Sequence, residues 1–167
     1  YILSQIPTAQ FTVGAPDTFE TTNATLVLTG TAPVLAQQIL VNGQPYPVSW
    51  VGTQTAPNGW RLRIPLEPGT NQLVVSAVDS RGVVLGERVL TINFTGPAVS
   101  PVGLVVFNEI MYNPAVPGTV FLELFNRSPD RSFDLSGWRI EGLGFTFPPG
   151  SIITNQQYLL LTQNRFG

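Results

Sequence analysis

The apolar residues of this chain come in short runs, rich in Val, Ile, Leu and Thr and bounded by Gly, Pro and Asn. Such runs are typical of β-strands, and the spacing of an amphipathic helix is almost absent. In the first 95 residues, the runs recur at a spacing of about 8–12 residues, which predicts an antiparallel β-sandwich. The expected strands are Ala9–Val13, Ala24–Thr29, Gln38–Asn42, Tyr46–Trp50, Trp60–Pro65, Gln72–Asp79 and Val83–Thr95.

Turn-forming residues separate these runs, as at Asn42-Gly43, Asn58-Gly59 and Ser80–Gly82. The run Gln72–Asp79 is apolar on both faces of the expected strand, which favours a central position in its sheet. We expect one apolar core to organise this part of the chain. Its expected members are Leu26, Val27, Ile39, Val41, Leu73, Val75 and Ile92.

A segment rich in Pro and Gly, residues 96–102, interrupts the strand pattern and predicts a short linker. Residues 1–95 form the first expected domain, in which residues 1–8 are a candidate extended arm, and residues 103–167 form the second. The expected strands of the second domain are Leu104–Tyr112, Thr119–Asn126, Trp138–Glu141 and Tyr158–Thr162.

The residue types that are missing from the chain exclude most catalytic chemistry. There is no His and no Cys, and all eight basic residues are Arg. Thiolate and imidazole metal sites, Ser-His-Asp triads and lysine Schiff bases are therefore excluded. A net charge of −2 gives no basic patch for nucleic acid or anionic lipid. We predict no catalytic residue, no metal and no cofactor.

Two carboxylates, Glu109 and Glu123, fall on neighbouring expected strands, and a carboxylate pair is the minimum for glycoside hydrolysis. Glu123 lies between Leu122 and Leu124, so it points away from the face that the two leucines bury. We interpret both glutamates as outward polar residues rather than as a catalytic pair.

Acidic residues near expected turns are candidate calcium ligands: Asp130, Asp134 and Glu141, with Asp17 and Glu20 as weaker candidates. Calcium needs six to eight oxygen ligands, and no loop of the EF-hand type is present. We interpret these acids as turn and capping residues.

Aromatic residues give two candidate contact sites. Trp50 and Trp60 flank a loop and are candidate glycan contacts, the alternative being a hydrophobic pair packed across two strands. Phe121 and Phe125 alternate with the leucines of their strand and are candidate contacts for a partner, the alternative being a strand buried on both faces.

Two parts of the sequence resemble known families. The segments VLTGTAPVLAQQILVNGQPY and GWRLRIPLEPGTNQLVVSAVDSRG resemble immunoglobulin-like accessory domains of secreted bacterial proteins, over about residues 10–95. The resemblance implies a spacer or binding module and names no ligand.

The second domain resembles the lamin tail domain family, an immunoglobulin-like fold found in nuclear lamins and in exported bacterial proteins. The matching motifs are Asn108-Glu109-Ile110, the strand through Leu122, Leu124 and Asn126, Asp134–Trp138 and Phe147–Gly150. The resemblance implies that Trp138 is a core residue. Because the family's module continues with further strands, we expect two immunoglobulin-like antiparallel β-sandwiches in this all-β chain, the second of them incomplete at Gly167.

These patterns predict a non-catalytic, extracellular or cell-surface protein with a structural or adhesive role. We expect a protein partner, either a second copy or the rest of a larger chain, with no nucleic acid and no membrane span. The apolar residues Tyr1, Ile2, Leu3 and Ile6 are candidates for a strand donated to another copy. The alternative function is a carbohydrate-binding or spacer module of a larger secreted protein.

Overall fold

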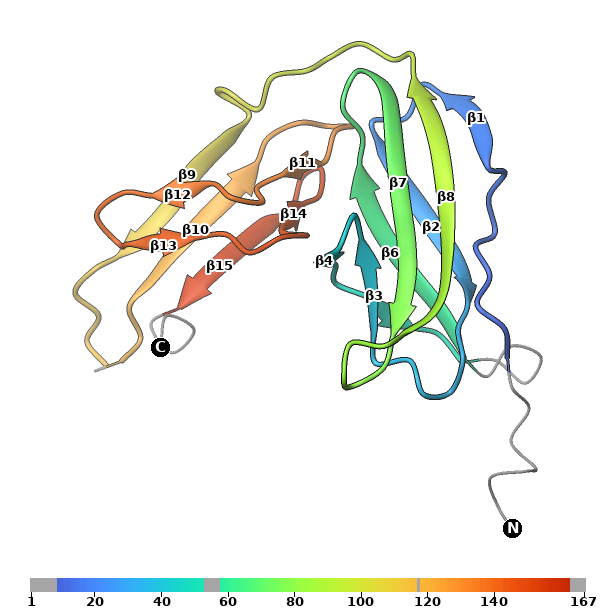
Figure 1. The fold of residues 1–167 in the computed structure, drawn as a ribbon. Coiled ribbons are helices and arrows are strands. Elements are labelled where there is room, and N and C mark those ends of the chain that lie inside the picture. The colour runs from blue at the N-terminus through green and yellow to red at the C-terminus, as the bar shows by residue number, and fades with distance from the viewer. Residues whose placement is uncertain (1–8, 53–57, 117, 163–167) are drawn as a thin grey trace. The chain divides into compact units, whose positions relative to one another are not determined.

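The computed structural model describes residues 9–52, 58–116 and 118–162, and every regular element among them is a β-strand (Figure 1). The chain divides into two compact units between Pro97 and Ala98. The prediction of an all-β chain is confirmed.

The N-terminal unit is built from two facing sheets. The five-stranded sheet has the order β1-β8-β7-β3-β4, and the three-stranded sheet has the order β2-β6-β5. Its strands are β1 (Thr18–Thr21), β2 (Thr25–Thr31), β3 (Gln38–Val41), β4 (Gln44–Pro45), β5 (Ser49–Trp50), β6 (Gly59–Pro65), β7 (Gly69–Val78) and β8 (Val84–Phe94).

The start of this unit differs from the prediction. Ala9–Val13 is not a strand, although the N–H groups of Thr12 and Gly14 donate to the carbonyls of Thr31 and Thr29. The first strand is β1 instead, and it pairs with β8 in parallel rather than antiparallel. Thr12 and Gly14 lie beside β2 in the smaller sheet, and β1 lies beside β8 in the larger sheet, so the chain crosses from one sheet to the other between them.

The core of the N-terminal unit lies between its two sheets. Strand β7 is the middle strand of the larger sheet, as its two apolar faces predicted. Of the expected core residues, Ile39, Val41, Leu73, Val75 and Ile92 are buried, and Leu26 packs against them partly buried. The expectation for Val27 is wrong, because Leu26 and Leu28 face inward and Val27, between them, is 43% exposed.

The largest side chain of this core is Trp60, which is fully buried. Its ring stacks on Phe11 with the centroids 6.0 Å apart, and its Nε1–H donates to the carbonyl of Thr31 at 3.0 Å. Gly30 is its cross-strand neighbour, and a Cβ at Gly30 would lie 2.7 Å from the Trp60 ring. Only glycine leaves room here for the indole.

Asp79 organises the turn between β7 and β8. Its Oδ1 accepts the backbone N–H groups of Val83, at 2.9 Å, and of Arg81, at 2.8 Å, and the Arg81 guanidinium binds Oδ2. The hydrogen bond from Val83 is the main reason that the pKa of Asp79 lies below its ordinary value, with Arg81 adding to the effect. Asp79 therefore caps this turn with its own side chain.

The C-terminal unit combines one three-stranded sheet, ordered β15-β10-β9, with two short ladders, β11-β14 and β12-β13. Its strands are β9 (Val105–Met111), β10 (Phe121–Asn126), β11 (Phe133–Asp134), β12 (Arg139–Ile140), β13 (Phe145–Thr146), β14 (Ile152–Ile153) and β15 (Tyr158–Thr162). The core side chains come from the sheet, from the ladder β11-β14 and from the residues that directly follow β11 and β13. They are Leu122, Leu124, Phe133, Leu135, Phe147, Ile153 and Leu161.

The expectation that Trp138 is a core residue is wrong, because 40% of it is exposed. Trp138 leads into β12, which is only two residues long and pairs with β13 alone. Leu135 and Phe147, which are held to the Trp138 backbone by hydrogen bonds, are buried in the core instead.

Candidate interaction surface

Strand β10 presents two different faces. Leu122, Leu124 and Asn126 are buried, while Phe121, Glu123 and Phe125 alternate with them and are half-buried. This alternation places both predicted contact residues, Phe121 and Phe125, on the side of the sheet away from the core.

The neighbouring strands extend this side into a continuous surface, which we call the outer face. Phe125 lies opposite Tyr158, and their rings stack with centroids 4.4 Å apart. Tyr158 is 56% exposed, and Leu160, opposite Glu123, is 47% exposed. From the register, the outer face comprises Val106, Glu109, Met111, Phe121, Glu123, Phe125, Tyr158, Leu160 and Thr162.

The polar centre of the outer face is a pair of glutamates. Glu109 and Glu123 lie directly opposite each other on β9 and β10, and a bulge follows at Asn108. Asn108 Nδ2 donates to Glu123 Oε1 at 2.6 Å. Neither glutamate forms an ion pair within the described residues. Like charges that face each other across strands are destabilising, so a cation from outside the unit would relieve this pair.

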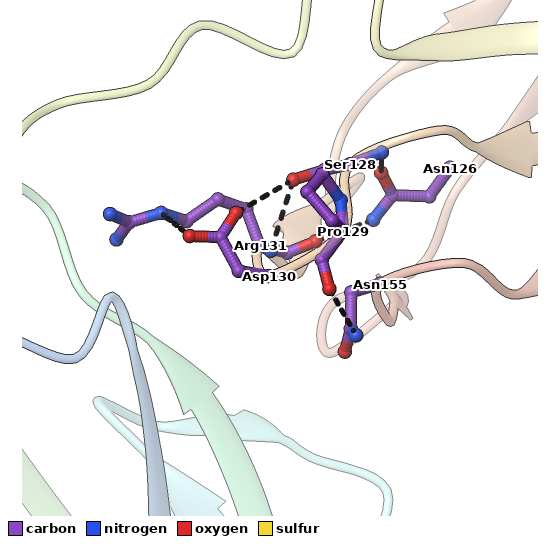
Figure 2. A network of polar contacts seen from close by, with 6 residues as sticks. All are labelled: Asn126, Ser128, Pro129, Asp130, Arg131 and Asn155. Carbon is purple, nitrogen blue, oxygen red and sulfur yellow. Dashed lines mark hydrogen bonds and ion pairs between the residues drawn. The ribbon is translucent and has the colours of Figure 1, made fainter.

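Below the outer face, Asn126 is a fully buried polar residue (Figure 2). Its Nδ2 donates to the carbonyls of Arg131 at 2.7 Å, Thr154 at 3.1 Å and Ile153 at 3.3 Å. Its Oδ1 accepts the backbone N–H of Ser128 at 2.9 Å. One side chain therefore joins the end of β10, the loop that follows it and the segment between β14 and β15.

The same loop is held by further contacts, as Figure 2 shows. The Arg131 N–H donates to Ser128 Oγ at 3.0 Å, and the Arg131 guanidinium lies 3.5 Å from the Asp130 carboxylate. Asn155 Nδ2 donates to the carbonyl of Pro129 at 2.9 Å. These contacts fix the position of β15, and therefore of Tyr158 and Leu160, beside β10.

The candidate calcium ligands have other partners or are exposed. Asp134 accepts the N–H of Ser136 at 2.8 Å and also its hydroxyl, as a cap does. Asp17 pairs with Arg88, and Glu20 accepts from Asn93. Glu141 is exposed, and Asp130 belongs to the loop of Figure 2. The described residues contain no group of three acids placed to bind a metal.

The two tryptophans weighed as glycan contacts have different environments. Trp60 is fully buried, so the expectation that it contacts a glycan is wrong. Phe11 stacks on its ring, and Gly30 packs closely against it. Trp50 lies opposite Trp60 in the register and is exposed. It borders a cavity of about 290 Å³, whose lining residues are Pro33, Val34, Ala36, Trp50, Asn58 and Gly59.

The candidate donor residues Tyr1, Ile2, Leu3 and Ile6 lie outside the described residues, so their role stays a prediction.

Comparison with known families bears on the second unit, which carries the outer face and the buried Asn126. Residues 98–166 match the family model of the Lamin Tail Domain. The predicted resemblance is confirmed, and we call this part of the chain the lamin tail unit. Lamin tail domains are immunoglobulin-like β-sandwiches that are in general not enzymes and act as structural or interaction modules.

No curated protein matches the chain. Among the described residues, no helix is long and apolar enough to cross a membrane.

Proposed function

We propose that the chain is a non-catalytic, extracellular or cell-surface protein with a structural or adhesive role, and that its outer face contacts another protein. The observation that supports the proposal is the composition of this face. A stacked aromatic pair, Phe125 and Tyr158, and the exposed Leu160 surround two glutamates on a sheet held rigid from below by Asn126. Exposed apolar groups that gather on one rigid face are typical of contact surfaces.

The extracellular part of the proposal rests on composition. Only 11% of the residues are charged, against about 25% in ordinary soluble chains, so Thr, Ser, Asn and Gln must wet the surface. The resemblance of residues 10–95 to accessory domains of secreted proteins supports the same conclusion.

Strand donation between copies is a further part of the proposal. Strand β15 is at one edge of the three-stranded sheet, and β9 is at the other. An edge strand offers unpaired N–H and C=O groups to an added strand, and the apolar segment Tyr1–Ile6 is the proposed donor.

Two measurements test the proposed function. Antibody against the chain should label intact, unpermeabilised source cells, and labelling only after permeabilisation would contradict an extracellular role. Retention of the chain on those cells should be lost in the double variant Tyr158→Ser/Leu160→Ser. The matched control is Val83→Ser/Val84→Ser, in which two exposed apolar residues of the N-terminal unit are changed. Equal retention of both variants would contradict the assignment of the outer face.

The cavity beside Trp50 favours a second candidate function, the binding of a polysaccharide. An exposed indole can stack on the CH groups of a sugar ring, and Asn58 supplies a polar group in the same cavity. Pull-down on insoluble polysaccharides should then be abolished by Trp50→Ala and unchanged by Trp138→Ala, which removes an equally accessible indole. Pull-down that survives Trp50→Ala, or that never occurs, would reject this candidate.

A further inference from the structure

The N-terminal unit carries a pair of arginines on one sheet face. On β6, Trp60, Leu62 and Ile64 are buried, while Arg61 and Arg63 alternate with them and are exposed. Within the described residues neither arginine forms an ion pair. We call these two residues the arginine pair, and Glu109 with Glu123 the acidic pair.

The cross-strand neighbours of the arginine pair include no acidic residue. In the register, Thr29 and Ser49 lie opposite Arg61, and the exposed Val27 lies opposite Arg63. Two positive charges on one open face are therefore left without a counter-charge beside them in the sheet.

The other five arginines of the described residues are placed differently. Arg81, Arg88 and Arg131 each form an ion pair with an aspartate. Arg127 and Arg139 are exposed single residues, one after the end of β10 and one in the two-residue strand β12. Within the part of the chain that the structure describes, Arg61 and Arg63 are the two that share one sheet face without an ion pair.

We propose that the arginine pair of one copy of the chain binds the acidic pair on the outer face of a second copy. The inference rests on the proposed function and names its partner. Residues two apart on a strand are about 6.6–6.8 Å apart, and directly opposed residues on neighbouring strands are about 4.5–5.5 Å apart. The flexible arginine side chains span this small difference, so both guanidinium groups reach a carboxylate.

The apolar residues around the acidic pair fit the same partner. A guanidinium group stacks on an aromatic face while it binds a carboxylate, and Tyr158 and Phe125 offer such faces next to Glu123. Val27, which lies opposite Arg63 on the partner copy, would pack in the same contact against exposed apolar groups such as Leu160. Contact also relieves the repulsion between Glu109 and Glu123.

The two surfaces differ, so the contact is heterologous. Each copy has one arginine pair and one acidic pair, so a bound copy still offers a free surface of each kind. Repetition of such a contact extends head to tail unless the rotation closes a ring. The chain should therefore form oligomers of increasing size as its concentration rises, rather than a dimer alone.

Sedimentation velocity of the purified chain, from micromolar to millimolar concentration, tests the proposal. We expect the average mass to rise with concentration at low salt. It should fall at 1 M salt, where charges are screened beyond about 3 Å. Glu109→Arg/Glu123→Arg and Arg61→Glu/Arg63→Glu should each raise the dissociation constant about tenfold or more, because like charges then meet.

Mixing these two double variants provides the decisive measurement. Each variant alone carries two surfaces of the same sign, so each alone should associate at least about tenfold more weakly than the wild-type chain. In a 1:1 mixture the reversed surface of each variant meets the opposite sign on the other, and association should return. Glu87→Arg and Arg139→Glu change exposed charges elsewhere and should leave the association of the chain unchanged.

Three results would overturn the proposal: a wild-type chain that stays monomeric at all concentrations, association that is insensitive to both charge reversals, and a mixture that does not associate. In each case the outer face would need a different protein partner, and the proposed function would still be judged by the Tyr158→Ser/Leu160→Ser variant. Circular dichroism of each variant checks that the exposed substitutions leave the fold intact.

Discussion

Replacing Asn126 by Leu should strongly destabilise the lamin tail unit and leave the stability of the N-terminal unit unchanged. The substitution keeps the approximate size of the side chain and removes all its hydrogen bonds. The carbonyls of Arg131, Ile153 and Thr154 and the N–H of Ser128 then lose a partner in a buried environment.

The expected cost follows from these contacts. A buried group left without its partner costs about 1–3 kcal/mol, and the bonds at 2.7 Å, 2.9 Å and 3.1 Å are the three that are well formed. We therefore expect a loss of about 3–5 kcal/mol in the free energy of unfolding. A unit of about 70 residues has a total stability of roughly 4–10 kcal/mol. The loss is therefore a large fraction of the stability of this unit.

Urea titration followed by hydrogen exchange and mass spectrometry measures the two units separately. In Asn126→Leu, peptides from β10 and β15 should exchange freely at urea concentrations at which β7 and β8 are still protected. Asn155→Ala is the matched control, because it removes one exposed hydrogen bond from the same network and should cost about 1 kcal/mol or less. Equal costs for the two variants would refute the central role of Asn126.

Two other substitutions have defined outcomes. Gly30→Ala places a Cβ 1.9 Å from the carbonyl oxygen of Thr12 and 2.7 Å from the Trp60 ring, and it should lower the stability of the N-terminal unit by about 1–3 kcal/mol, measured by urea unfolding. Unchanged stability would contradict the close packing. The pKa of Asp79 is lower in the folded state, so its stabilising effect is present above the ordinary pKa of about 3.9 and is lost as the pH falls through the folded value. The difference in melting temperature between wild type and Asp79→Asn should accordingly shrink between pH 7 and strong acid, and a difference that is constant with pH would reject this linkage.

The strands were predictable because their signal is local. In Gln72–Asp79 both faces are apolar, and this property alone indicates a central strand, which β7 is. The alternation around Leu122 and Leu124 likewise placed Glu123 on the outer side of its strand. By contrast, the apolar run from Leu26 to Leu28 does not reveal which residues face inward, and so Val27 was assigned to the wrong side.

The tertiary features were harder to predict, because they depend on residues far apart in the sequence. Trp50 and Trp60 look equivalent in sequence. Trp60 is buried because β6 is the central strand of its sheet and because its ring packs against Gly30 and Phe11, whereas Trp50 is in the edge strand β5. Asn126 did leave a signal: it continues the buried face of Leu122 and Leu124, and a polar residue at a core position must have buried partners. The parallel pairing of β1 left none.

Hydroxyl-radical footprinting tests most directly the claim that the outer face is a protein contact surface. The oxidation rate of Tyr158 is compared between the purified chain at low concentration and the chain on its source cells, with the exposed Trp138 as internal reference. We predict that Tyr158 is protected several-fold on the cells while Trp138 is not. Unchanged oxidation of Tyr158, together with protection of Trp50, would contradict the claim and favour the polysaccharide site instead.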